Sequence, residues 1–178
     1  MNRIARITLL LMTILILPRP AMPESYWGTD PTGGTRITDP AFSVSDHEAV
    51  SDGAGGMILV WSEDRGGDSD IYASRISADG LILWEEDGTA ICTASGEQTV
   101  PKIIVDGNGG AVIVWRDQRG TTSFYAQAID ESGLPYWTVD GIPIADDCFG
   151  PDDHAITADG TGGGVLWGSS ILHTAEED

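Results

Sequence analysis

Apolar runs rich in β-branched residues alternate with short glycine turns along most of this chain. Residues 102–105 and 111–115 are two such runs, and residues 106–110 between them place glycines where a tight turn needs positive φ angles. Two β-prone runs joined by a short glycine-bearing loop predict a β-hairpin. The second run does not alternate with polar residues, so we expect both of its faces to be buried between other sheets.

The turn and the run that follows it occur three times, at residues 52–61, 106–115 and 159–167, which gives a period of about 53 residues. No segment beyond residue 22 has a helical period. Four strands are predicted per unit, and in the first full unit they begin at His47, Met57, Ile71 and Leu81. Ile37, Ile91 and Ile144 each precede the turn aspartate by 15 residues, so the intervening segments belong to the repeat.

A four-stranded unit of this length is typical of a β-propeller blade. The sequence therefore predicts an all-β chain of antiparallel four-stranded blades. Two full and two partial units are too few for a closed ring of 4–8 blades. An incomplete ring has three interpretations: a truncated longer protein, which we favour, an open stack, or half of an assembly. Its unpaired strand edges would invite self-association. The expected organisation is a partial unit at 27–46, full units at 47–100 and 101–153, and a unit at 154–178 without its third and fourth strands.

The turn after the third strand resembles the Asp-box of BNR-type repeats in sialidase-like secreted propellers, whose pattern is Ser/Thr-x-Asp-x-Gly-x-x-Trp. Ser77, Asp79 and Trp84 match it, whereas Gly80 is one position early, and Ser132 replaces the aspartate in the second copy. The wider pattern over residues 27–167 is similar to repeat arrays of bacterial exported and surface proteins. The resemblance implies a propeller fold. The arginine cluster, tyrosine nucleophile and acids of sialidases have no residue-by-residue counterpart in this chain.

The first 22 residues have the pattern of a secretory signal peptide. Arg3 and Arg6 precede an apolar run at residues 7–17, and prolines then break any helix before Ala21. An uncleaved membrane anchor is the alternative, although the run is short for a bilayer span. We therefore expect a secreted or cell-surface protein, with no membrane contact beyond this segment.

The chain is strongly acidic, with a net charge of −19 that becomes −22 when the three arginines of residues 1–22 are removed with no acid. Such a surface repels nucleic acid and anionic membranes. Cys92 and Cys148 are the two cysteines. In an exported protein they form either a disulfide or two small buried apolar groups.

Acid–arginine pairs recur just beyond the second strand of each full unit. Glu63 with Arg65, and Asp117 with Arg119, either bind a polar ligand or form local ion pairs that hold the loop. We favour the ion pair, because a single binding site rarely needs the same group in every unit.

Two further groups of residues are weak candidates for metal binding. The acidic loop with Asp64, Asp68 and Asp70 has the oxygen ligands that calcium prefers, although a solvated loop is the simpler interpretation. His47 and His154 occupy equivalent positions and are either metal ligands or ordinary strand-start residues. No other cofactor is indicated.

The six tryptophans fall in two registers of the repeat, which favours packing between sheets over a sugar-binding surface. Triads, zinc motifs and phosphate-binding loops are absent from the sequence. The predicted function is an exported, non-catalytic module that binds glycan or protein or serves as a surface spacer. A glycoside-processing enzyme of the sialidase-like kind is the alternative.

Overall fold

The computed structural model describes residues 34–121, 123–146, 154–160, 162–168 and 172–175. Its regular structure consists of antiparallel strands, and the described residues form no helix, so none that could cross a membrane. The all-β prediction is therefore confirmed. The strands are β1 (Ser43–Ser51), β2 (Met57–Asp64), β3 (Ser69–Ile76), β4 (Thr89–Cys92), β5 (Gln98–Val105), β6 (Ala111–Asp117), β7 (Ser123–Ile129), β8 (Ile142–Asp146), β9 (His154–Ala158), β10 (Gly164–Gly168) and β11 (Leu172–Ala175).

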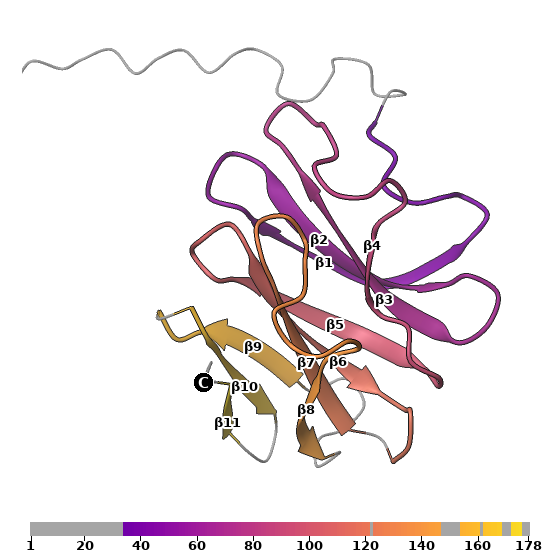
Figure 1. Ribbon diagram of the computed structural model, residues 1–178, viewed down its shortest axis with the longest axis vertical. Helices are drawn as coiled ribbons and strands as arrows, with labels where there is room; N and C mark the ends of the chain where they lie inside the picture. The colour runs from indigo at the N-terminus through magenta and orange to yellow at the C-terminus, as the bar shows by residue number, and fades with distance from the viewer. Residues whose placement is uncertain (1–33, 122, 147–153, 161, 169–171, 176–178) are drawn as a thin grey trace, which may run out of the picture.

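The strands form three sheets that follow one another along the chain. Strands β1 to β4 and β5 to β8 make two four-stranded sheets in sequence order, and β9 to β11 make a three-stranded sheet. Figure 1 shows the sheets stacked from the N-terminal sheet at the top to the C-terminal sheet at the bottom. The first strands of the three sheets are neighbours in space: β5 contacts both β1 and β9. The described strands do not close into a ring.

The glycine turns form the predicted hairpins between β1 and β2, β5 and β6, and β9 and β10. In the second sheet, Asp106 accepts hydrogen bonds from the backbone N–H groups of Asn108 and Gly110, at 2.7 and 2.9 Å. Gly110 is required sterically, because a Cβ there would lie 2.1 Å from the carbonyl oxygen of Ile129. The aspartate closes the turn, and the glycine lets the end of β7 approach the turn.

Three predicted details of the units are wrong. The fourth strand does not begin at Leu81: residues 81–84 make one isolated bridge between Ile76 and Ile82, and β4 follows later. This difference arises because Asp87 and Gly88 have positive φ angles that return the chain to β3. The first strand begins at Ser43 rather than at His47. The third unit does have a third strand, β11, which pairs with β10.

Trp167 is not in register with the two earlier tryptophans of the repeat. The turn bond from Asp159 N to Gly163 O matches that from Asp106 N to Gly110 O, but Trp167 follows its turn aspartate one residue sooner than Trp115 does. Trp167 pairs with Ala155 as Val114 pairs with Lys102. Because alternate strand positions belong to opposite faces, the third copy places its tryptophan in the register of Val114.

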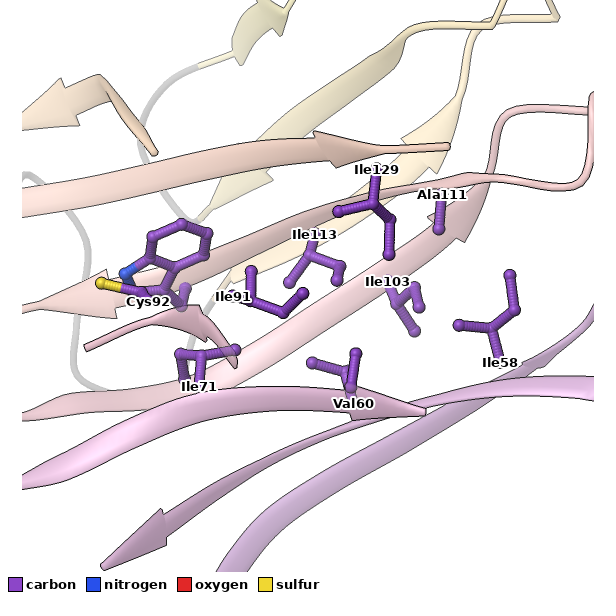
Figure 2. Close-up of a cluster of buried hydrophobic side chains, with 11 residues drawn as sticks. Ile58, Val60, Ile71, Ile91, Cys92, Ile103, Ala111, Ile113 and Ile129 are labelled. Atoms are coloured by element: carbon purple, nitrogen blue, oxygen red, sulfur yellow. The ribbon is translucent and has the colours of Figure 1, made fainter. Parts of the chain in front are cut away.

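The main core lies between the first two sheets (Figure 2). Ile58, Val60 and Ile71 of the first sheet pack against residues of the second that include Ile103 and Ile113. The opposite face of the second sheet has its own cluster, formed by Val114, Phe124 and Ala126 with Ile156 of β9 against it. All of residues 111–115 are buried, which confirms the prediction from their unbroken apolar run. The second sheet is thus covered on both faces.

A bulge interrupts β1 and β5 at equivalent positions, where Asp46 and Val100 have φ angles of 41° and 52°. A β-branched residue is strained in this left-handed region, at a cost of about 1–3 kcal/mol. We expect Val100→Asn to raise the free energy of unfolding by about 1 kcal/mol in urea denaturation. Val105→Asn, in ordinary extended backbone, is the control and should lower it. A loss of stability in Val100→Asn would contradict the assignment of strain.

Candidate functional site

The Asp117–Arg119 pair forms the centre of a buried cluster at the end of β6. Nε and Nη2 of Arg119 donate to the two carboxylate oxygens of Asp117 at 2.9 and 2.7 Å. The indole N–H of Trp115 donates to Oδ2 of Asp117 at 2.9 Å. The guanidinium lies 4.0 Å from the centre of the Tyr125 ring, which stacks on Trp115 at 6.4 Å. A tryptophan, an acid, an arginine and a tyrosine therefore make one connected unit.

The first sheet repeats this cluster with Glu63 in place of Asp117. Arg65 donates to Glu63 Oε2 from Nε at 2.8 Å and from Nη2 at 2.7 Å. Trp61 donates to the same oxygen at 3.3 Å and stacks on Tyr72 at 6.4 Å, and Arg65 lies 3.6 Å from the centre of the Tyr72 ring. The two tryptophans thus occupy equivalent environments in the two sheets.

Each cluster also holds the loop that leads into the fourth strand. Arg119 Nη2 donates to the carbonyl oxygen of Asp140 at 2.7 Å, and Arg65 donates to that of Asp87. The following residues, Gly141 and Gly88, lie against the tryptophan rings. A Cβ at either glycine would approach its ring to 2.5 Å. The arginine and the indole therefore fix this loop from two sides.

Burial and hydrogen bonding act in opposite directions on the Asp117 carboxyl. Burial alone would raise its pKa, but the hydrogen bonds from Arg119 and Trp115 outweigh that effect and hold the pKa below its ordinary value. The hydrogen bond to Asp117 raises the pKa of Arg119. The side chains of Glu63 and Asp117 are 0% exposed, whereas those of Arg65 and Arg119 are 26% and 24% exposed. A ligand could reach only the arginine edges, so the geometry is that of an internal ion pair.

The clusters also link neighbouring segments, which the sequence did not predict. Cys92 of β4 lies across the seam between the first two sheets, and its Sγ accepts from Arg119 Nη2 at 3.1 Å. Thr38, which occupies the equivalent repeat position, donates to Glu63. Cys92 is a free buried thiol, and burial raises its pKa to about 12. The shared spacing of Thr38 and Cys92 from the turn aspartate is the one sequence signal for this contact. Cys148 lies outside the described residues.

Two of the three carboxylates considered for calcium have separate backbone partners. Asp64 accepts from the backbone N–H groups of Gly66 and Gly67, at 2.7 and 2.8 Å. Asp68 accepts from that of Gly96 at 2.8 Å, which ties the loop to the segment between β4 and β5. Within the described part of the chain, no three His, Cys, Asp or Glu side chains gather closely enough to hold a metal ion.

The third of these carboxylates, Asp70, has a perturbed pKa. Burial, together with the charges of Asp68 and Asp140, raises the pKa of Asp70 to about 6. In the unfolded chain this pKa is about 3.9, so the ionised carboxylate lowers stability at neutral pH and this cost disappears as the pH falls from about 6 to about 4.

We expect Asp70→Asn to raise the free energy of unfolding by about 1 kcal/mol at pH 7.5, a value reduced for solvent screening, and to have no effect near pH 4. Urea denaturation at both pH values measures this difference. Asp79→Asn, on an exposed turn, is the control. An equal effect of Asp70→Asn at both pH values would show that charge is not the cause.

The two histidines lie on different sheets and in different environments. His47 is exposed on β1. His154 is buried on β9, where its Nε2 lies 3.0 Å from the carbonyl oxygen of Val100 and its ring 4.7 Å from that of Phe124. His154 thus contacts the bulge of β5 from the third sheet.

The Asp-box-like turn uses its first residue as the cap. Ser77 Oγ accepts from the backbone N–H of Leu81 at 3.1 Å. At the equivalent position Asp130 accepts from Ser132 and Leu134, at 2.8 and 3.0 Å. Asp79, which matches the aspartate of the Asp-box pattern, is exposed at the tip of the turn.

A surface hollow of about 150 Å³ lies at the seam between β4 and the loop from β7 to β8. Ile91, Thr93, Gln127, Pro135, Val139 and Asp140 are among its lining residues. Its volume is below the roughly 300–1,000 Å³ of typical small-molecule sites.

Comparisons with known proteins identify no relative: no family, curated protein or solved structure matches this chain.

Proposed function

We propose that this protein is an exported, non-catalytic repeat module that binds a glycan or protein partner or serves as a surface spacer. The observation that carries the proposal is that the recurring acid–arginine pairs are bonded within their own sheets. Glu63 and Asp117 are fully buried and bonded to an arginine and an indole within their own sheet. The residues that a repeat-wide binding or catalytic site would use are engaged in holding the sheets.

We further propose that the three sheets are consecutive propeller-type blades. Three features support this arrangement: the sequential strand order of the four-stranded sheets, the contacts of β5 with both β1 and β9, and the repeated cluster around Trp61 and Trp115. The resemblance to Asp-box and BNR-type repeats agrees with it. Export is inferred from the pattern of residues 1–22.

The test of the non-catalytic role is a panel of fluorogenic glycosides, including sialosides, incubated with the purified protein. We expect no turnover above that of the heat-denatured protein. Turnover by the folded protein above this background would overturn the proposal and favour the glycoside-processing alternative. A glycan array on the same sample separates a glycan-binding module from a spacer.

A further inference from the structure

Exposed apolar side chains are concentrated in two equivalent loops. The loop from β3 to β4 carries Leu81 and Leu83, which are 64% and 50% exposed. The loop from β7 to β8 carries Leu134, Tyr136 and Val139, which are 61–82% exposed. Of the large apolar side chains in the described chain, only one other, Val44 on β1, is exposed to a similar degree. Apolar side chains gathered in this way mark interaction sites more often than those scattered singly.

The loop from β7 to β8 contacts the loop from β3 to β4 across the seam between the first two sheets. Trp84 Nε1 donates to the carbonyl oxygen of Glu131 at 3.0 Å, and Arg75 Nη1 donates to the same oxygen at 3.2 Å. The Trp84 ring packs on Gly133, where an added Cβ would lie 2.9 Å from the ring. The loop of one sheet therefore rests on the loop of the next, so the exposed apolar residues are carried by two loops in contact.

The surface hollow adjoins the second of these loops, because Pro135 and Val139 line it. A cavity of about 150 Å³ is large enough to take benzene, which is comparable in size to one apolar side chain. Interfaces commonly depend on one such anchor seated in a pocket with weaker contacts around it. The hollow is therefore suited to a single leucine- or phenylalanine-sized group from a partner.

The charge around these apolar residues restricts the partner. Asp79, Glu85, Glu86 and Glu131 are exposed on the same two loops, and Asp140 lines the hollow. The whole chain has a net charge of −19, so a second copy would be repelled. Complementary charge favours a segment that carries lysine or arginine.

We propose that this seam patch, formed by Leu81, Leu83, Leu134, Tyr136, Val139 and the adjoining hollow, docks a basic protein segment with one apolar anchor residue. The anchor enters the hollow, the apolar loop residues cover its flanks, and the carboxylates face the basic side chains. This inference specifies the partner class of the proposed binding module and rests on that function.

The experiment titrates the isotopically labelled full chain with the peptide Lys-Ser-Lys-Ser-Leu-Ser-Lys-Ser-Lys and follows amide shifts by NMR. We expect saturable shifts around Thr93, Gln127 and Val139. Replacing the central leucine of the peptide by serine should weaken binding about tenfold, as expected for losing one buried leucine. Leu134→Ser and Val139→Ser in the protein should each weaken it about fivefold, whereas Val44→Ser, on the first strand, should leave it unchanged.

Three results would overturn the inference: no shifts at millimolar peptide, equal affinity for the leucine and serine peptides, or an equal effect of Val44→Ser. Equal affinity would mean that general charge attraction alone drives the contact. The glycoside panel tests the parent proposal separately. Glycan binding without peptide binding would leave the module function intact and refute only this partner.

Discussion

Gly141→Ala is expected to destabilise the protein by about 3–4 kcal/mol, which is a large fraction of the stability of a typical domain. The added methyl would meet the Trp115 ring at 2.5 Å and the carbonyl oxygen of Ala126 at 2.6 Å, and neither can move freely. The φ angle of 77° adds a backbone penalty. Gly88→Ala, against Trp61, should behave alike. The free energy of unfolding in urea, with near-ultraviolet circular dichroism of the indoles, measures the loss.

Gly107→Ala is the matched control for this prediction. Its φ angle of 83° gives a similar backbone penalty, but an added Cβ there meets nothing within 4 Å. We expect it to cost only about 1 kcal/mol. The difference between the two variants measures the clash with the Trp115 ring and the Ala126 carbonyl oxygen. Equal losses in both would mean that Trp115 is not packed against this loop.

Asp117→Asn is expected to lower the free energy of unfolding by about 3–5 kcal/mol, because it removes one partner of a buried ion pair. The amide loses the charge that Arg119 and the Trp115 indole both contact. The partly exposed pair of Glu48 and Lys102, at 3.8 Å, gives the control: Glu48→Gln should cost about 0–1 kcal/mol. A loss as small in Asp117→Asn would contradict the structural role of the cluster.

The pH dependence gives a second readout of this pair. Because the folded-state pKa of Asp117 is lowered, its stabilising effect is complete above the unfolded pKa of about 3.9 and is lost as the pH falls through the folded value. The stability difference between the native protein and Asp117→Asn should therefore be constant from about pH 5 to pH 7 and shrink below about pH 4. Urea denaturation across this range measures it.

Local patterns in the sequence predicted the parts of the fold that depend on neighbouring residues. The glycine turns predicted the hairpins, because positive φ angles, as at Gly107 and Gly109, and a capping aspartate, as at Asp106, are local requirements. The unbroken run at residues 111–115 predicted burial on both faces. The fourth strand was misplaced at Leu81, because a short apolar run does not reveal whether it pairs with the sheet or forms an exposed loop.

The sequence by itself therefore determined the hairpins, the β class and the recurrence of the Trp–acid–Arg cluster. Only the tertiary structure decided how one unit meets the next. The contact of Cys92 with Arg119, the packing of Trp84 on Gly133 and the hollow beside Val139 all lie at the seam between two sheets. The physical reason is that turn geometry and strand pairing within a hairpin depend on residues close in sequence. Contacts at the seam depend instead on how two whole sheets stack, which no short pattern specifies.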